Sequence, residues 1–140
     1  MSNSNYTDML RKMYPQVPFQ KLLGVEVLDA ADDYSKVQIK FRPELAGGGD
    51  AYHGGVISSL VDLTGALAVW MGHDVEKKGM KASTVSLNVQ FLGAALGENI
   101  VAEGRCIKRG KELNFCNIEI HGADTNKQVA SGSIVYRIAK

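Results

Sequence analysis

Apolar and polar side chains alternate strictly over residues 36–43, where Val37, Ile39 and Phe41 fall on one face and charged or polar side chains on the other. A period of two is typical of a half-buried β-strand, because successive side chains of a strand point to opposite faces. Turn-forming residues separate five further segments that we predict as strands: 22–30, 83–93, 99–109, 112–122 and 128–138.

Two other segments have the character of helices. Residues 5–14 carry apolar side chains at helical spacing, and Pro15 and Pro18 are expected to end that helix. Residues 54–71 follow a glycine-rich loop and form a long apolar run that favours a helix over a strand. Its apolar side chains cover nearly the whole circumference, which predicts a buried helix. Gly72 is expected to end it, and residues 73–81 to form an exposed connection.

The order of these elements is one helix, two strands, one long helix and four strands. Antiparallel strands around a single central helix define an α+β arrangement. We therefore expect one domain, residues 1–140, in which a curved antiparallel sheet wraps around the helix at about residues 54–71.

Composition narrows the possible partners. The net charge is +1, from 16 basic and 15 acidic residues, so a nucleic-acid partner is not expected. The longest apolar window, 56–71, is too short and too often interrupted by polar residues to span a bilayer, and the N-terminal residues lack the apolar core of a secretory signal. We expect a cytoplasmic protein without a membrane partner. Cys106 and Cys116 match no metal spacing and are expected to be free thiols on neighbouring strands.

Asp62 is the exception within the apolar helix. Its neighbours three and four residues away are uncharged, which excludes a salt bridge along the helix: Ser58, Ser59, Gly65 and Ala66. A carboxylate without a partner in an apolar setting costs free energy, so such a residue is a candidate general base or nucleophile. The alternative is that Asp62 faces solvent at a gap in the sheet or bonds to Ser58.

The sequence His53-Gly54-Gly55 stands at the expected start of the same helix. The first N–H groups of a helix have no internal partner, and glycine lets a ligand carbonyl approach them, as an oxyanion hole requires. A flexible loop is the simpler alternative. Asp62 lies about two turns further on, roughly 12 Å along the axis, so one straight helix does not place both groups at one bound atom.

The stretch HGGVISSLVDLTGALA (53–68) resembles the hot-dog fold acyl-CoA thioesterases of the phenylacetate-pathway type, within the 4-hydroxybenzoyl-CoA thioesterase superfamily. The resemblance extends over most of the chain. It implies that Asp62 is the general base or nucleophile and that the Gly54 N–H polarises the thioester carbonyl. It also implies that His53 orients the loop and that Thr84 reaches the site from the partner subunit.

The resemblance further implies an acyl-CoA substrate, no cofactor or metal, and a homodimer or dimer of dimers with sites at the subunit interface. Gly55 and Asn88 are then candidates for substrate binding. The basic turn that holds Lys108, Arg109 and Lys111 is a candidate for the CoA phosphates, although a solvated hairpin tip is the favoured interpretation.

One position departs from the family pattern. Many relatives carry Asn or Gln six residues before the histidine, where this sequence has Gly47. Asp50, Tyr52 or a partner-subunit group such as Asn88 are possible substitutes. The departure keeps a second hypothesis open, a non-catalytic acyl-thioester binding protein on the same fold. A hot-dog dehydratase or hydratase is disfavoured by the nine-residue spacing from His53 to Asp62.

Overall fold

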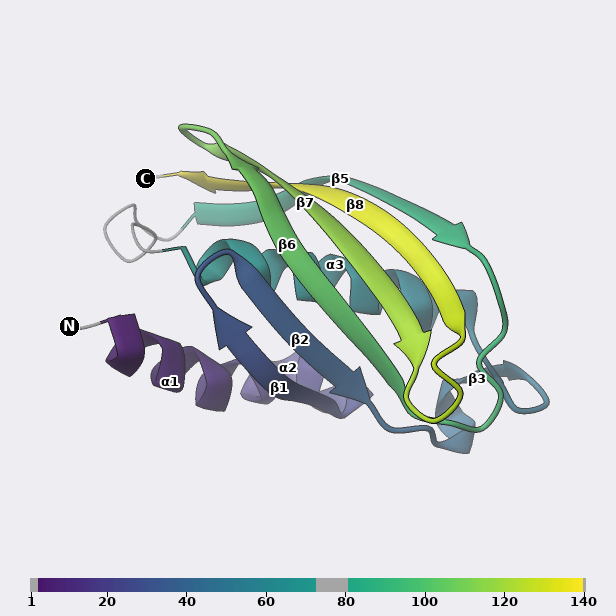
Figure 1. The fold of residues 1–140 in the computed structure, drawn as a ribbon. Coiled ribbons are helices and arrows are strands. Elements are labelled where there is room, and N and C mark those ends of the chain that lie inside the picture. The colour runs from purple at the N-terminus through teal and green to yellow at the C-terminus, as the bar shows by residue number, and fades with distance from the viewer. Residues whose placement is uncertain (1–2, 73–80, 140) are drawn as a thin grey trace.

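A curved antiparallel sheet of six strands wraps around one long helix, α3, in a computed structural model that describes residues 3–72 and 81–139 (Figure 1). The strands lie in the order β1-β2-β6-β7-β8-β5, so β1 and β5 form the two edges. Their bounds are Val25–Ala31 (β1), Tyr34–Ile39 (β2), Lys81–Phe91 (β5), Ile100–Arg109 (β6), Leu113–Gly122 (β7) and Gln128–Ala139 (β8). The expected α+β arrangement is confirmed.

Helix α3 (Gly54–Trp70) forms the centre of the core, as the all-round apolar pattern predicts. Leu60, Val61 and Leu67 have no solvent exposure. The helix packs against β2, β5, β6, β7 and β8, so the sheet covers it along most of its length.

Two glycines allow the helix to lie this close to the sheet. A Cβ atom on Gly65 of α3 would lie 2.7 Å from Cδ1 of Ile134 on β8. A Cβ atom on Gly132 of β8 would lie 2.6 Å from Cγ1 of Val61 on the helix. Both distances are far below van der Waals contact, so a side chain at either position would force the helix and the sheet apart.

The N-terminal segment differs from expectation. Helix α1 (Asn3–Met13) is followed by a 3-10 turn, η1 (Tyr14–Gln16), and by a second helix, α2 (Pro18–Leu23). Pro18 begins this helix instead of ending the first one, because the first position of a helix needs no N–H donor. The strand expected from residue 22 therefore begins only at Val25, after Gly24 ends α2 at a φ of 74°.

Smaller differences occur around the glycine-rich loop. Strand β2 ends at Ile39, and Pro43 begins a second 3-10 turn, η2 (Pro43–Leu45). The loop itself contains a short hairpin, β3 (Ala46–Gly48) and β4 (Ala51–Tyr52), that was not expected. The predicted exposed connection falls, apart from Lys81, outside the described residues. No helix within residues 3–72 and 81–139 is long and apolar enough to cross a membrane.

Candidate active site

The carboxylate of Asp62 bonds to a hydroxyl on the edge of the sheet. Thr84 lies on β5, and its Oγ1 donates a hydrogen bond of 2.6 Å to Oδ1 of Asp62. Among the described residues the carboxylate takes this distant partner rather than Ser58, the local one. Both residues belong to one chain, which corrects the expectation that Thr84 meets the carboxylate from the partner subunit. The cause is the path of the chain, which brings β5 back along α3.

Asp62 faces a cavity of about 250 Å³, which we call the carboxylate pocket. Helix α3, edge strand β5, strand β8 and the N-terminal helical segment all contribute to its wall. The lining side chains are largely polar: Tyr14, Phe19, Gln20, Ser59, Asp62, Leu63, Ala66, Ser83, Thr84 and Tyr136. The pocket therefore combines one carboxylate with several hydroxyl groups, which is a suitable environment for a reactive water molecule.

Two tyrosines in this pocket are fixed by hydrogen bonds. The Tyr14 hydroxyl donates to the carbonyl of Leu63 at 2.6 Å. The Tyr136 hydroxyl instead accepts a bond of 3.1 Å from Nε1 of Trp70. Burial raises the pKa of both phenols, so both stay protonated at neutral pH.

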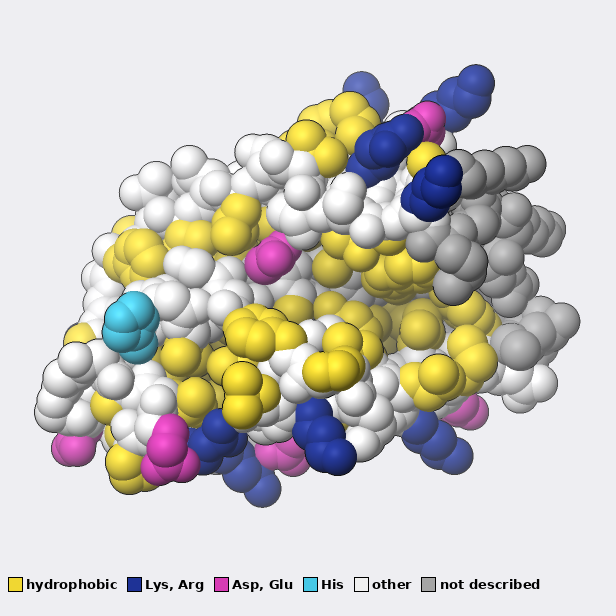
Figure 2. Space-filling view, turned by 180° about the vertical axis from the view of Figure 1, so that it is seen from behind, with side chains coloured by type: hydrophobic (Ala, Val, Ile, Leu, Met, Phe, Trp, Pro, Cys, Tyr) yellow, Lys and Arg dark blue, Asp and Glu magenta, His cyan; other side chains and the backbone are white. Residues whose placement is uncertain are grey.

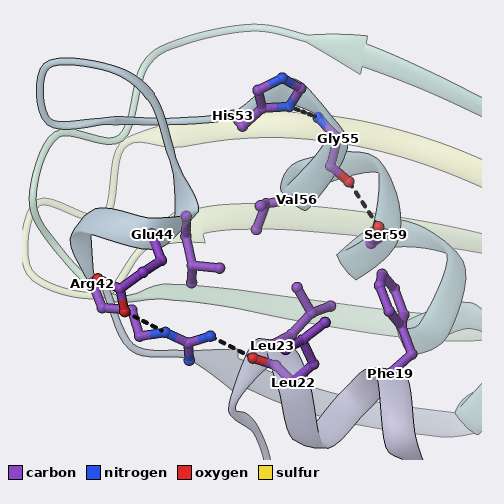
Figure 3. A pocket seen from close by; sticks show the side chains of 10 residues that line it. Phe19, Leu22, Leu23, Arg42, Glu44, His53, Gly55, Val56 and Ser59 are labelled. Atoms are coloured by element: carbon purple, nitrogen blue, oxygen red, sulfur yellow. Dashed lines mark hydrogen bonds and ion pairs between the residues drawn. The ribbon is translucent and has the colours of Figure 1, made fainter.

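A second cavity, of about 350 Å³, adjoins the carboxylate pocket, and Phe19 and Ser59 line both. We call it the apolar pocket (Figure 3). Its wall is formed by α2, η2 and the first turns of α3: Phe19, Leu22, Leu23, Arg42, Glu44, Leu45, His53, Gly55, Val56 and Ser59. Arg42 holds α2 against η2, because its guanidinium donates to the carbonyl of Leu22 and pairs with Glu44 at 3.4 Å.

The start of α3 presents one free backbone donor. Nδ1 of His53 accepts a hydrogen bond of 2.8 Å from the N–H of Gly55, so the histidine caps the helix. Gly54 is the first helical residue and is exposed, and its N–H has no hydrogen-bond partner among the described residues. The capped Gly55 N–H is not available to a ligand, whereas the Gly54 N–H is.

The structure therefore brings the candidate residues together as two groups. Asp62 and Thr84 form one, and His53, Gly54 and Gly55 form the other. Along the axis of α3 the two groups are separated by eight residues, roughly 12 Å, which is too far for both to contact one carbonyl carbon and its oxygen. The two pockets adjoin each other along the helix, where Phe19 and Ser59 line both.

Arg109 does not lie with either group. Its guanidinium pairs with Asp33 and donates to the carbonyls of Ala68 and Val69, at 3.2 and 2.8 Å, in the last turn of α3. A cation at the C-terminal end of a helix satisfies carbonyls that have no internal partner. The structure thus corrects the expectation of a phosphate ligand at Arg109, which is a helix cap. Its neighbour Lys108 is exposed.

The glycine at position 47 packs against the histidine of the site. A Cβ atom on Gly47 would lie 3.1 Å from Cα of His53, so a side chain there would require the loop to shift. Tyr52 is no substitute for an amide, because its buried hydroxyl donates to the carbonyl of Glu98 at 2.7 Å. Asn88 is exposed on β5, and its Oδ1 accepts a bond of 3.3 Å from Gln90.

Several residues of the two pockets were not found from the sequence. Trp70 lines neither pocket, but from the end of α3 it donates a hydrogen bond to Tyr136, which lines the carboxylate pocket. Tyr14, Phe19 and Tyr136 gave no local signal, because they come from the N-terminal helices and from the last strand. Only the tertiary fold places them beside Asp62.

Comparison with known proteins agrees with this fold. Residues 50–129 match the model of the thioesterase superfamily. Human acyl-coenzyme A thioesterase 13 is 26% identical over 127 residues, which cover 89% of this chain and 88% of that protein.

Two solved structures show the same fold. The zebrafish thioesterase superfamily member 2 has a TM-score of 0.81 at 24% identity and covers 99% of each chain. The Escherichia coli PaaI protein from the phenylacetic acid degradation operon has a TM-score of 0.84 at 21% identity, over 99% of this chain and 97% of that one. The match with the family model spans more than half of the chain, including α3 and its carboxylate. This protein is a hot-dog fold member of the thioesterase superfamily.

Proposed function

We propose that this protein hydrolyses an acyl-CoA, or a related acyl thioester, to a free acid and a thiol, with Asp62 as the general base. The observation that carries the proposal is the Asp62 carboxylate, which Thr84 holds at 2.6 Å in the wall of a polar pocket. Membership of the thioesterase superfamily supports hydrolysis of a thioester in general.

The chemistry needs two groups that act on the thioester carbonyl. Asp62 removes a proton from a water molecule as the water oxygen bonds to the carbonyl carbon. The N–H of Gly54 donates to the carbonyl oxygen, which becomes negatively charged in the tetrahedral intermediate. When that intermediate collapses, the carbon–sulfur bond breaks, and the proton on Asp62 passes to the departing thiolate. The products are a carboxylic acid and a thiol.

The separation of Gly54 from Asp62 supports an assembly of two copies. Since the two groups are roughly 12 Å apart along one helix, a complete site needs the Gly54 of one subunit beside the Asp62 of another. Exposed apolar side chains on the edge strand β5 and the loop after it offer a surface for self-association: Val85, Leu87, Phe91, Leu92 and Leu96. We propose a homodimer, or a dimer of dimers, with sites between subunits.

The apolar pocket is the proposed place for the acyl group. It adjoins the carboxylate pocket, with which it shares the lining residues Phe19 and Ser59, so a thioester carbonyl near Asp62 would have an apolar cavity beside it. Figure 2 shows the molecule from behind the view of Figure 1. The surface there is hollowed, and hydrophobic side chains gather along the hollow.

The second candidate is a protein that binds acyl thioesters without hydrolysing them. It is favoured by Gly47, which supplies no side chain to the site, and by the distance between Gly54 and Asp62 within one chain. The two candidates differ in one measurable property, the release of thiol.

The test is thiol release from a panel of aromatic and aliphatic acyl-CoAs by wild type and by Asp62→Asn. We expect turnover by wild type and a loss of about a hundred-fold or more in kcat for Asp62→Asn. Asp32→Asn, the same change at an exposed aspartate, is the matched control and should retain activity. Binding of the panel without thiol release would replace the enzyme with the binding protein. Full turnover by Asp62→Asn would remove the role given to that carboxylate.

A further inference from the structure

Tyr136 lies directly beside the Asp62–Thr84 pair. In the ladder between β5 and β8, Tyr136 is the cross-strand partner of Thr84, so the two side chains are neighbours on the same face of the sheet. Tyr136 and Asp62 both line the carboxylate pocket. The phenol thus reaches the pocket from strand β8, whereas the carboxylate reaches it from helix α3.

The direction of hydrogen bonding leaves the phenol proton available. Because Nε1 of Trp70 is a donor only, its 3.1 Å bond to Tyr136 uses a lone pair of the phenol oxygen and not the phenol proton. Among the described residues, no side chain or carbonyl accepts that proton. Burial raises the pKa of Tyr136, which keeps the proton on the oxygen throughout the neutral pH range.

The pocket has the size and the polarity to hold a water molecule between these groups. Tyr136 and Asp62 line it without bonding to each other among the described contacts, and its volume of about 250 Å³ exceeds that of one water. A water placed there would have a carboxylate acceptor in Asp62 and a hydroxyl donor in Tyr136, which meets the two to four polar partners that an ordered water requires.

We propose that Tyr136 is a catalytic residue that donates its hydrogen bond to the attacking water, and that Trp70 is a positioning residue that fixes the phenol for this purpose. The inference rests on the proposed hydrolysis at Asp62. The water accepts a hydrogen bond from Tyr136 with one lone pair and gives one of its two protons to Asp62. Its other lone pair forms the carbon–oxygen bond. Tyr136 keeps its own proton throughout, so the step balances without another reactant.

The test compares Tyr136→Phe with wild type on the acyl-CoA of the panel that wild type hydrolyses fastest. Removing the phenol oxygen should lower kcat by about 10- to 100-fold, because the water loses one of its two anchors. KM should stay within about two-fold, and so should the Kd of the matching S-alkyl-CoA thioether, because Tyr136 does not hold the acyl group. Trp70→Phe keeps the Tyr136 phenol but removes the indole N–H that donates to it, and this variant should lower kcat by a smaller factor than Tyr136→Phe.

The matched control is Tyr34→Phe, which also deletes a phenol oxygen. The Tyr34 hydroxyl donates to Glu103 at 2.7 Å, away from both pockets, and this variant should keep the wild-type kcat. If wild type turns over and Tyr136→Phe keeps its kcat, the role of Tyr136 is wrong while the proposed hydrolysis stands. A Tyr136→Phe variant whose lower kcat is accompanied by weaker thioether binding and a lower melting temperature would also overturn the inference, since that pattern indicates a structural role. A wild type without turnover removes both proposals.

Discussion

The hydroxyl of Thr84 donates a 2.6 Å hydrogen bond to the carboxylate of Asp62, although 22 positions separate the two residues in the chain. Helix α3 supplies the carboxylate, and the edge strand of the sheet supplies the hydroxyl. A hydrogen bond to a charged group is stronger than a neutral one, so this contact holds the carboxylate in a defined orientation.

Replacing Thr84 by valine keeps the branched shape but removes the donor. We expect Thr84→Val to lower kcat about ten-fold, because Asp62 loses the bond that orients it and its oxygen is left without a partner. Thr84→Ser keeps a hydroxyl and should retain most of the activity. The measurement is the kcat of both variants on the same acyl-CoA, and equal activity in the two would contradict the role of the hydroxyl.

Replacing Gly54 by proline removes one N–H group and little else. Proline suits the first position of a helix, and His53 before it is already extended, with φ −60° and ψ 139°, as a residue before proline must be. We expect Gly54→Pro to fold with a melting temperature near that of wild type and to lose about a hundred-fold in kcat.

Gly54→Ala is the matched variant, because it keeps the N–H. Its Cβ atom would lie 3.5 Å from the ring of Phe91, an ordinary contact, so activity should remain within a few-fold of wild type. If Gly54→Pro were as active as Gly54→Ala, the carbonyl would not bind at this N–H.

Mixing two inactive variants tests whether the site lies between subunits. A heterodimer of Gly54→Pro and Asp62→Asn has one site with both changes and one site with neither, if each site takes Gly54 from one chain and Asp62 from the other. After unfolding and refolding at equal concentrations, about a quarter of wild-type activity should return, because half of the dimers are mixed and each has one intact site. Activity no greater than the sum of the separate variants would place the whole site within one chain.

Cys106 and Cys116 face each other across β6 and β7, and both are free thiols, as expected from the sequence. The neighbouring Cys116 thiol lowers the pKa of Cys106 to about 7. Because the thiolate is the reactive form, alkylation of Cys106 by iodoacetamide should rise with pH around a midpoint near 7. Cys116→Ala removes the neighbouring thiol and should move the midpoint upward. An unchanged midpoint would show that this thiol does not lower the pKa of Cys106.

The cap that Arg109 provides should contribute to stability. Arg109→Ala removes a partly buried ion pair with Asp33 and two bonds to the carbonyls of Ala68 and Val69. We expect a loss of about 1–3 kcal/mol in the free energy of unfolding, measured by urea denaturation. Lys108→Ala, one residue away and exposed, should change it by less than about 0.5 kcal/mol. Similar losses in the two variants would contradict the assignment of Arg109 as the cap.

The sequence by itself determined the fold class. The two-residue alternation around Val37 and Ile39 and the all-round apolar character of residues 54–71 report burial directly, since each side chain's solvent exposure follows from the period of its element. It also identified Asp62 as a carboxylate that needs a partner, and Gly54 as a free donor at a helix start. The prediction that Pro18 ends a helix was wrong, because proline is found both after the end of a helix and at its first position, and the residue alone does not distinguish the two.

Only the tertiary structure decided which residues meet. Tyr136 comes from the last strand, and its separation in the chain hides its proximity to Asp62. Thr84 was expected to reach Asp62 from the partner subunit, whereas the fold brings it there within one chain. It likewise showed that Arg109 caps α3, where its charge had suggested a phosphate ligand. The physical reason is that periodicity fixes which face of an element is buried, whereas contacts between side chains depend on strand order and on how closely the helix packs against the sheet.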